Sequence, residues 1–253
     1  MEGLSGHPLR RRRRLALRRP HVRGALTRVP ASRATGRQLV LLRHGRTSDN
    51  AGGRIQGQLD TPLDDVGRRQ AREAAQSLAA LRPAVLVSSD LVRARDTAQA
   101  VLDQGGGALR LDPRLRELHL GAWQGLTTGQ ARERFPEEHE AWRTGRDVPR
   151  GGGETYRQAG ARAAEAVQDV LADVPAGGAL LAVTHGGTAR ALLGVLLELD
   201  PDQWWRLAPL GNVRCSVLVE HPRGWRLDRH NSEPDGLVAP DVPSASAAAG
   251  PVR

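Results

Sequence analysis

The stretch LVLLRHGRTSDN, residues 39–50, decides how the rest of the chain is interpreted. Its apolar first half is typical of a buried strand, which we predict over residues 38–43. The strand ends without a spacer at His44, which lies between Arg43 and Arg46. The glycine after the histidine lets backbone approach a ligand closely. Together these residues indicate a cationic pocket for an anion at the end of a rigid strand.

A second apolar run repeats this pattern far along the chain. The segment GALLAVTHGG, residues 178–187, is typical of a buried strand that ends at His185. Gly186 follows, and a helix that begins here can offer N–H groups to an anion. We therefore expect both histidines to face the same ligand.

Buried apolar strands alternate with amphipathic helices along the chain. This order predicts an α/β fold with three α/β/α layers around a mostly parallel central sheet. In such sheets the ligand crevice lies outside the carboxyl ends of the strands, so Arg43, His44, Ser88, Ser89 and His185 should share one rim. Further strands are predicted at 84–90, 108–111, 215–221 and 224–229, a loop at 45–62, and helices at 64–81, 91–103, 127–144 (one or two), 155–173 and 188–199.

The basic residues are concentrated at the amino-terminal end. The chain has 253 residues, enough for one domain with tails, and all 37 basic residues are arginine. Residues 1–37 contain eleven arginines and one acid, a net charge of +10 that leaves −1 for the remainder. We predict a disordered basic arm over 1–37, a folded domain over 38–232 and a disordered tail over 233–253.

A nearly neutral domain argues against a nucleic-acid-binding fold, and we expect no nucleic-acid partner. Polyanion binding by the arm alone stays open as a separate hypothesis. The arm has no apolar run of signal-peptide length, and no segment approaches the roughly 20 apolar residues of a membrane span. We therefore expect a cytoplasmic protein with no membrane partner. The single cysteine, Cys215, excludes an internal disulfide and a metal site built from several cysteines.

Two histidines and several arginines on one rim suit phosphoryl chemistry. The transferred group carries its charge on three oxygens, and arginine grips a phosphate through two parallel hydrogen bonds. A neutral imidazole can attack phosphorus, whereas a protonated one can donate to a phosphate oxygen. Arg93, in SSDLVRARDTA, could bind the anion, and Glu117, in LRELHLGAWQG, could act as a general acid. Taken alone, each is more simply a solvated helix arginine or an ordinary loop carboxylate.

Acidic residues also stand before two of the predicted helices. Asp90 is a candidate cap of the helix that follows it. Glu154, in RGGGET, is a candidate cap after a glycine-rich turn. That turn is not a nucleotide-binding P-loop, because no Gly-Lys-Ser/Thr follows it.

In combination these motifs resemble the histidine phosphatase superfamily, also called the phosphoglycerate mutase-like family. Its hallmark, a strand leading into Arg-His-Gly-x-Thr, is present at residues 43–47. The blocks RIQGQLDTPLDDVGRRQA, SSDLVRARDTA, LRELHLGAWQG, GGGET and VTHGG follow in the family's order, over about residues 38–230. The resemblance implies a phosphoglycerate mutase-like fold and catalysis without a metal or other cofactor.

The resemblance also implies roles for the matched positions. His44 would be the nucleophile that becomes phosphorylated, and Glu117 would be the proton donor that later helps to activate water. The groups that hold the phosphoryl group would be Arg43, Arg93 and His185. The remaining matched positions would line the substrate pocket or support it: Asn50, Gln56, Gly57, Glu154 and Gly186. Among these, Glu154 would support the histidines from behind.

The loops favour a phosphatase over a mutase. Mutases of this family usually carry ERHYG after the acid and a long insertion before the GGE block. Here LHLGAWQG follows Glu117, and Glu154 comes only 37 positions later. Several loops look most like those of actinobacterial glucosyl-3-phosphoglycerate phosphatases, so the expected partner is a small phosphorylated substrate. A phosphoglycerate mutase and a phosphatase of broad specificity for sugar phosphates remain alternatives, and a homodimer stays open because family members are often dimers.

Overall fold

The computed structural model describes residues 36–105 and 108–237. The predicted arm, up to residue 35, and the predicted tail, from residue 238, lie outside the described residues. The packed structure extends slightly beyond the predicted domain of 38–232. Arg37 forms an ion pair with Glu220 on the sheet, and Leu237 is buried against the core. Both ends of the domain therefore extend a few residues beyond the predicted bounds.

Six strands form one sheet in the order β3-β2-β4-β1-β5-β6. The pairs among the first four run parallel, whereas β5 runs antiparallel to β1, and β6 runs antiparallel to β5. The prediction of an α/β fold with a mostly parallel central sheet is confirmed. The strands are β1 (Gln38–Arg43), β2 (Val85–Ser88), β3 (Leu109–Leu111), β4 (Ala179–Thr184), β5 (Cys215–His221) and β6 (Gly224–Ser232).

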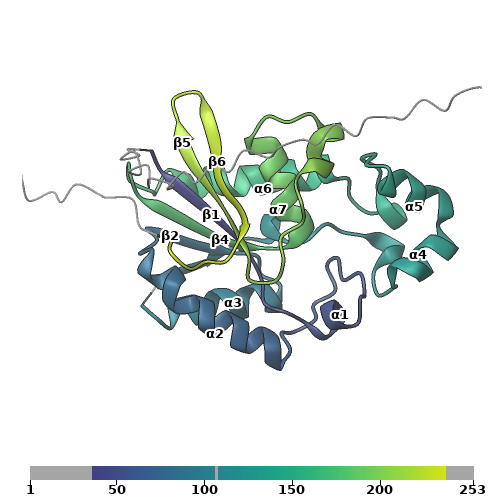
Figure 1. Cartoon of the computed structure of the whole chain (residues 1–253), viewed down its shortest axis with the longest axis horizontal. Helices are drawn as coiled ribbons and strands as arrows, with labels where there is room; N and C mark the ends of the chain where they lie inside the picture. The colour runs from purple at the N-terminus through teal and green to yellow at the C-terminus, as the bar shows by residue number, and fades with distance from the viewer. Residues whose placement is uncertain (1–35, 106–107, 238–253) are drawn as a thin grey trace, which may run out of the picture. The chain divides into compact units, whose positions relative to one another are not determined.

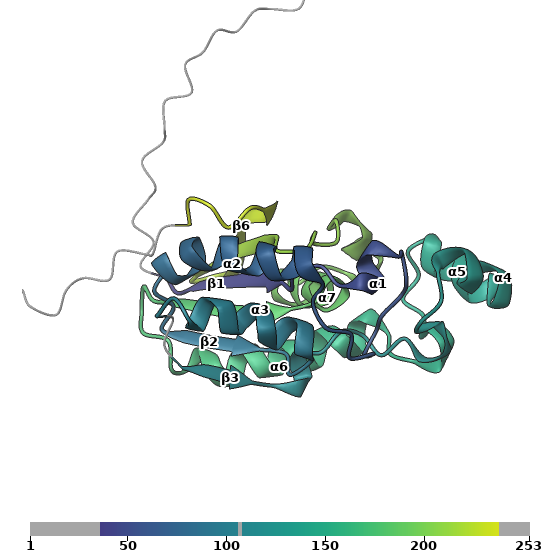
Figure 2. The same ribbon diagram turned by 90° about the horizontal axis from the view of Figure 1, so that it is seen from below.

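Helices cover both faces of the sheet and complete the three layers (Figure 1). On one face lie α2 (Asp65–Ala80) and α3 (Val92–Leu102), which run side by side in Figure 2. On the other face lie α6 (Tyr156–Leu171) and α7 (Gly186–Leu196). Within the described residues, no helix is long and apolar enough to cross a membrane.

The alternation of side chains along β1 supplies a core on each face. Val40 and Leu42 pack toward α2 and α3, whereas Leu39 and Leu41 pack toward α6 and α7. None of the four is exposed to solvent. Because successive side chains point to opposite faces, an all-apolar strand needs helices on both sides. This packing holds the residue that follows the strand, His44, in a fixed position.

The loop predicted over 45–62 contains the one-turn helix α1 (Ser48–Ala51). Thr47 and Asn50 form a reciprocal cap, in which each side chain accepts a hydrogen bond from the other residue's backbone N–H. Two such bonds satisfy backbone donors that a loop would leave to water. The short helix fixes the chain directly after the Arg-His-Gly segment.

The region predicted as one or two helices over 127–144 forms two, α4 (Thr128–Arg134) and α5 (Pro136–Arg143). Pro136 begins the second helix, where its missing N–H costs nothing. Both helices extend beyond one end of the sheet in the two views (Figures 1 and 2). They lie on the side of α1 rather than over a sheet face.

Neither acidic residue predicted as a helix cap has that position. The helix α3 begins without a side-chain cap, because Asp90 forms an ion pair with Arg116. Thr155, not Glu154, caps α6, and Gln158 completes the capping box. In both cases the carboxylate pairs with an arginine side chain instead of capping the helix.

Candidate active site

The carboxyl ends of β1, β2 and β4 meet at one edge of the sheet, with β4 between the other two strands. They are followed by His44, by Ser89 and by His185, respectively. The two imidazole rings have centroids 5.0 Å apart, and both side chains are buried. The structure therefore brings together the two histidines that the sequence places 141 positions apart.

The backbone fixes the protonation pattern of His44. Its Nδ1 lies 2.7 Å from the carbonyl oxygen of Gly45, which can only accept, so Nδ1 carries the proton. Its Nε2 lies 3.3 Å from Nε of Arg93, which can only donate, so Nε2 keeps its lone pair. A neutral imidazole with a free pair on Nε2 is the nucleophilic form.

The two ring nitrogens of His185 have different surroundings. Its Nε2 lies 2.9 Å from the Ser89 hydroxyl. Its Nδ1 is buried and makes no hydrogen bond among the described residues. A buried nitrogen without a partner is costly, so a ligand that bonds to it is favoured.

Two guanidinium groups flank His44 without a carboxylate partner in the described part of the chain. Arg93 is 1% exposed and donates to backbone carbonyls of the 57–59 loop at 2.6 and 2.7 Å. Arg43 donates to the carbonyl of Leu210 at 2.6 Å, and its Nε is buried without a partner. Carbonyl groups orient these cations but do not neutralise them, so the pocket favours an anion.

The same charges keep the histidines neutral. Burial lowers the pKa of His44 and of His185 well below the ordinary value, and the positive charges of Arg43 and Arg93 lower it further. Burial also lowers the pKa of each of these guanidinium groups, while the nearby charge of Glu117 acts in the opposite direction. Glu117 is therefore close enough to act electrostatically on both arginines.

Gln56 and Gly57 lie where the loop after α1 approaches Arg93. Gln56 is buried, and its Oε1 makes no hydrogen bond within the described residues. Gly57 has a φ of 53°, and a Cβ on it would lie 2.3 Å from Oε1 of Gln124. Its carbonyl accepts a hydrogen bond from Arg93 at 2.7 Å, so a glycine here lets the loop reach the guanidinium.

Asn50 is connected to the nucleophile through a residue that the sequence did not indicate. Its Oδ1 accepts a hydrogen bond from Asn212 at 3.1 Å, as well as the capping bond from Thr47. Asn212 also donates to the backbone carbonyl of His44 at 3.1 Å. This side chain thus ties α1 to the end of β1.

Glu117 lies against the amino end of α7. Its Oε1 accepts from the backbone N–H groups of Leu118 at 3.0 Å and Thr188 at 2.8 Å. The Thr188 hydroxyl lies 3.1 Å from the same Oε1 and 2.8 Å from the Arg116 carbonyl, which compete for its one proton. The Oε2 of Glu117 accepts from the N–H of Gly187 at 3.0 Å. The N–H groups that the sequence suggested for an external anion are therefore used by the chain's own carboxylate. Gly186 itself lies beside Arg43, whose Nε would be 3.5 Å from an added Cβ.

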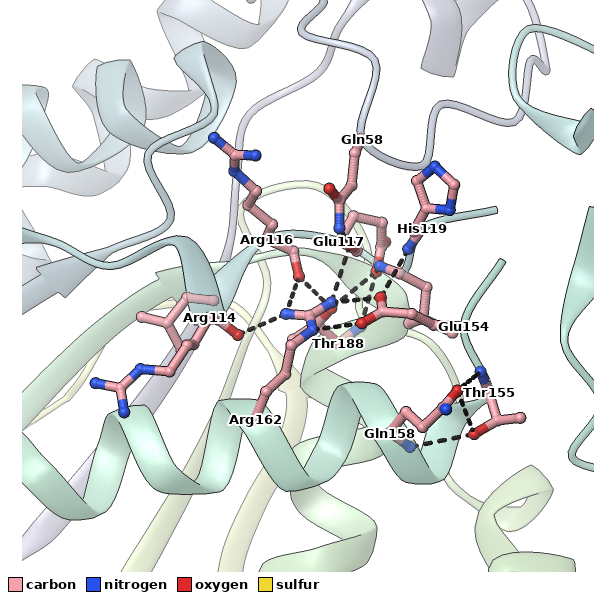
Figure 3. A network of polar contacts seen from close by, with 12 residues as sticks. Gln58, Arg114, Arg116, Glu117, His119, Glu154, Thr155, Gln158, Arg162 and Thr188 are labelled. Carbon is pink, nitrogen blue, oxygen red and sulfur yellow. Dashed lines mark hydrogen bonds and ion pairs between the residues drawn. The ribbon is translucent and has the colours of Figure 1, made fainter. Parts of the chain in front are cut away.

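Arg162 of α6 holds the segment that carries Glu117 (Figure 3). It donates to the backbone carbonyls of Arg114, Arg116 and Glu117 at 2.5, 2.9 and 3.1 Å. Gln58 adds a bond to the Glu117 carbonyl at 3.0 Å. Five guanidinium protons in a fixed fork allow one arginine to bind several carbonyls at once.

Glu154 supports this segment and makes no hydrogen bond to either site histidine. Its carboxylate pairs with Arg162 at 2.8 Å on both oxygens and accepts from the N–H of His119 at 2.8 Å (Figure 3). Burial raises the pKa of Glu154, but its bonds from Arg162 and His119 outweigh this, and the pKa lies below the ordinary value. Among the described residues Glu154 therefore contacts the site only through Arg162 and His119, and its support of the histidines from behind stays a prediction.

Several residues that hold the site in place belong to no sequence motif that would have identified them as site residues. Thr97 accepts from the N–H of Gly45 at 3.0 Å and donates to the carbonyl of Arg93 at 2.7 Å. Its position four residues after Arg93 on one helix was the available hint. Asn212 and Arg162 lie in segments without a recognised motif, so only the packed structure identifies them.

Three or more histidine, cysteine or acidic side chains do not gather at any point of residues 36–105 and 108–237 in a way that could hold a metal ion. The two histidines are instead surrounded by arginines and hydroxyl groups. This donor set suits an anionic ligand.

The sequence pattern of the histidine phosphatase superfamily (branch 1) matches residues 39–233. The chain belongs to this superfamily. The predicted resemblance is thereby confirmed, and with it the class of enzyme, a phosphatase of the phosphoric monoester hydrolases.

Individual members of the superfamily are similar to the chain over most of its length. The chain is similar to a glucosyl-3-phosphoglycerate phosphatase of Mycolicibacterium vanbaalenii, with 41% identity over 223 residues, 81% of this chain and 98% of the relative. It is also similar to a probable phosphoglycerate mutase of Yersinia enterocolitica, with 39% identity over 195 residues, 74% of this chain and 87% of the relative. A solved mycobacterial glucosyl-3-phosphoglycerate phosphatase in complex with VO3 has a TM-score of 0.72 and 41% identity, covering 78% of this chain and all of that one.

Proposed function

We propose that the protein hydrolyses small phosphate monoesters through a phosphohistidine on His44, with no metal ion. One observation carries this proposal. A buried imidazole whose Nδ1 proton is fixed by Gly45 presents its Nε2 lone pair between Arg43 and Arg93, which have no carboxylate partner in the described residues. A nucleophile inside a cationic pocket suits attack on a phosphate, since most of the catalysis of phosphoryl transfer is positioning and electrostatic.

In the first step, Nε2 of His44 attacks phosphorus, and the bond between phosphorus and the ester oxygen breaks. The charge on the phosphoryl oxygens is held by Arg43, by Arg93 and by His185, whose Nδ1 has no protein partner among the described residues. Glu117 donates a proton to the leaving oxygen. Of its two oxygens, Oε2 accepts one backbone hydrogen bond and Oε1 accepts two, so Oε2 has the free capacity for this contact.

In the second step, Glu117 takes a proton from water, and the resulting oxygen nucleophile attacks the phosphorus of phosphohistidine. The bond between phosphorus and Nε2 breaks, inorganic phosphate leaves, and His44 returns to its neutral form. The low pKa of the buried imidazole favours this return. Each proton that Glu117 gives in the first step is thus recovered in the second.

For the natural substrate we propose glucosyl-3-phosphoglycerate. The support is the similarity, over 98% of its length, to the mycobacterial-type phosphatase named for that substrate, together with the loops quoted from the sequence. Asn50, Gln56 and Gly57 are the proposed pocket residues near the substrate's organic part. Gln56 supports this role, because its buried Oε1 is free to accept a hydroxyl.

A panel of phosphate esters, assayed in the presence of a chelator, tests both the reaction and the substrate. We expect phosphate release to continue with the chelator and the highest kcat/KM for glucosyl-3-phosphoglycerate. Rapid acid-free quenching with a labelled substrate should trap acid-labile phosphate on His44, and His44→Ala should abolish both the label and the turnover. A label on another side chain, or a requirement for a divalent ion, would overturn the mechanism.

A phosphoglycerate mutase is the second candidate, supported by the 39% identity to a probable mutase. The same phosphohistidine would then return its phosphate to the second hydroxyl of a glycerate. Incubation with 3-phosphoglycerate distinguishes the two, since a mutase yields the 2-phospho isomer and a phosphatase yields inorganic phosphate. A cytoplasmic location, a homodimer and the absence of a nucleic-acid partner remain predictions from the sequence.

A further inference from the structure

A second cavity lies outside the candidate active site, between α5, the start of α6, α7 and the turn η4 (Pro201–Arg206). Its volume is about 230 Å³. None of its lining residues belongs to the histidine and arginine cluster described above. For comparison, an apolar cavity of about 150 Å³ holds a benzene molecule. The space therefore accommodates a larger ring with a substituent.

Aromatic side chains form the walls of this cavity. Trp142, Tyr156, Trp204 and Trp205 line it, although the chain has only six tryptophan and tyrosine residues in total. Trp205 is 63% exposed, a high value for a tryptophan. Trp204, in contrast, is buried in a hydrophobic cluster against which Trp142 and Tyr156 pack, so Trp205 supplies the accessible aromatic surface at this concave site.

The cavity also contains arginines whose charge is not neutralised within the described residues. Arg146 and Arg190 have no carboxylate partner there, and the Nε of Arg190 is buried without a hydrogen bond. The guanidinium of Arg190 lies 6.0 Å from the ring centroid of Tyr156. The acidic residue of the lining, Asp147, is already used, because its carboxylate accepts the backbone N–H groups of Tyr156 and Arg157 at the start of α6.

We infer that this cavity binds a small organic anion with a planar ring. The ring stacks on the exposed Trp205, and the anionic group takes hydrogen bonds from Arg146 and Arg190. Charge complementarity favours this occupant over a neutral aromatic molecule. A carboxylate on an aromatic ring satisfies both requirements and, unlike a phosphate ester, is not a substrate of the proposed reaction.

Calorimetric titration of the full chain with indole-3-acetate tests the inference. We expect one binding site per chain, at least tenfold weaker binding of the matched neutral indole-3-acetamide, and no binding of acetate under the same conditions. Arg190→Gln and Arg146→Gln should each weaken indole-3-acetate binding about tenfold, the loss expected for one hydrogen bond to a charged group. Arg132→Gln, an exposed arginine on α4, serves as the matched control and should change nothing.

Two further measurements establish that indole-3-acetate binds in this cavity rather than in the phosphate pocket. Arg93→Met, which impairs the proposed phosphate pocket, should leave the affinity unchanged, and the indole N–H signals of Trp204 and Trp205 should shift while that of Trp225 stays. Equal binding of the acid and the amide, or full affinity in both Arg146→Gln and Arg190→Gln, would overturn the inference. So would sedimentation showing a dimer that Trp205→Ala dissociates, because a second copy would then cover the cavity.

Discussion

Nε of Arg93 lies 3.3 Å from Nε2 of His44, so an arginine N–H points at the proposed nucleophilic atom. The other two nitrogens of this guanidinium are held by carbonyls of the 57–59 loop. The loop carbonyls thus hold the cation in place beside His44. In the proposed reaction, a phosphate would replace only the bond to His44 and would meet an arginine that is already oriented.

Arg93→Lys should test this orientation. A lysine keeps the charge but cannot bind His44, two carbonyls and a phosphate in one plane. We expect kcat/KM to fall about 100-fold, the typical loss for one oriented donor at a developing charge. The measurement is steady-state kinetics with an aryl phosphate. A variant with a near-normal kcat/KM would show that charge alone suffices at this position.

Glu117→Gln should separate substrates by their leaving groups. Alkyl phosphates need protonation of the leaving oxygen, and a general acid typically contributes 10²–10⁴-fold. We expect a loss on the order of 100-fold or more for an alkyl ester and less than about tenfold for 4-nitrophenyl phosphate. Thermal unfolding must be followed as a control, because Glu117 also bonds to the amino end of α7. Equal slowing of both esters would remove Glu117 from the acid role.

Arg162→Met should impair protonation of the leaving oxygen, because Arg162 positions the segment that carries Glu117. Without Arg162 the carbonyls of Arg114, Arg116 and Glu117 lose their common donor, so the Glu117 segment shifts. We expect the alkyl ester to slow more than the aryl ester, partial rescue in Arg162→Lys, and a loss of about 2 kcal/mol in unfolding free energy. Arg157→Met, an exposed neighbour on α6, is the matched control. A loss of stability with no change in leaving-group dependence would leave Arg162 a structural role only.

The buried histidines should make stability depend on pH. Their pKa is lowered in the folded state, so between the unfolded value of about 6.5 and the lower folded value the unfolded chain binds more protons. Their contribution to stability is therefore complete above about pH 6.5 and is lost as the pH falls below it, by about 1.4 kcal/mol per pH unit for each histidine. Urea unfolding from pH 7 to pH 5 measures this slope.

The same urea unfolding series on His44→Asn and on His185→Gln separates the contribution of each histidine to the pH dependence of stability. Each variant should lose less stability on acidification than the original chain does. A slope that is unchanged in both variants would contradict the burial argument, because other groups would then account for the proton uptake.

The sequence by itself determined the α/β layers and the rim on which His44 and His185 meet. Apolar strands with helices between them allow few arrangements, and parallel strands end at one edge of the sheet, so residues far apart in the chain converge there. The positions of Arg43 and Arg93 follow from the same rule, because each is within a few residues of a strand end.

Only the tertiary structure decided which hydrogen-bond and ion-pair partners the side chains of the site have. Glu154 precedes a helix as a cap would, yet it binds Arg162, and Glu117 binds the end of α7 rather than leaving it for a ligand. Such choices depend on which donors lie within about 3 Å of the carboxylate in the folded chain, and a linear pattern carries no information on that distance. The aromatic cavity arises in the same way, because its walls come from separate segments between residues 142 and 205 that share no motif.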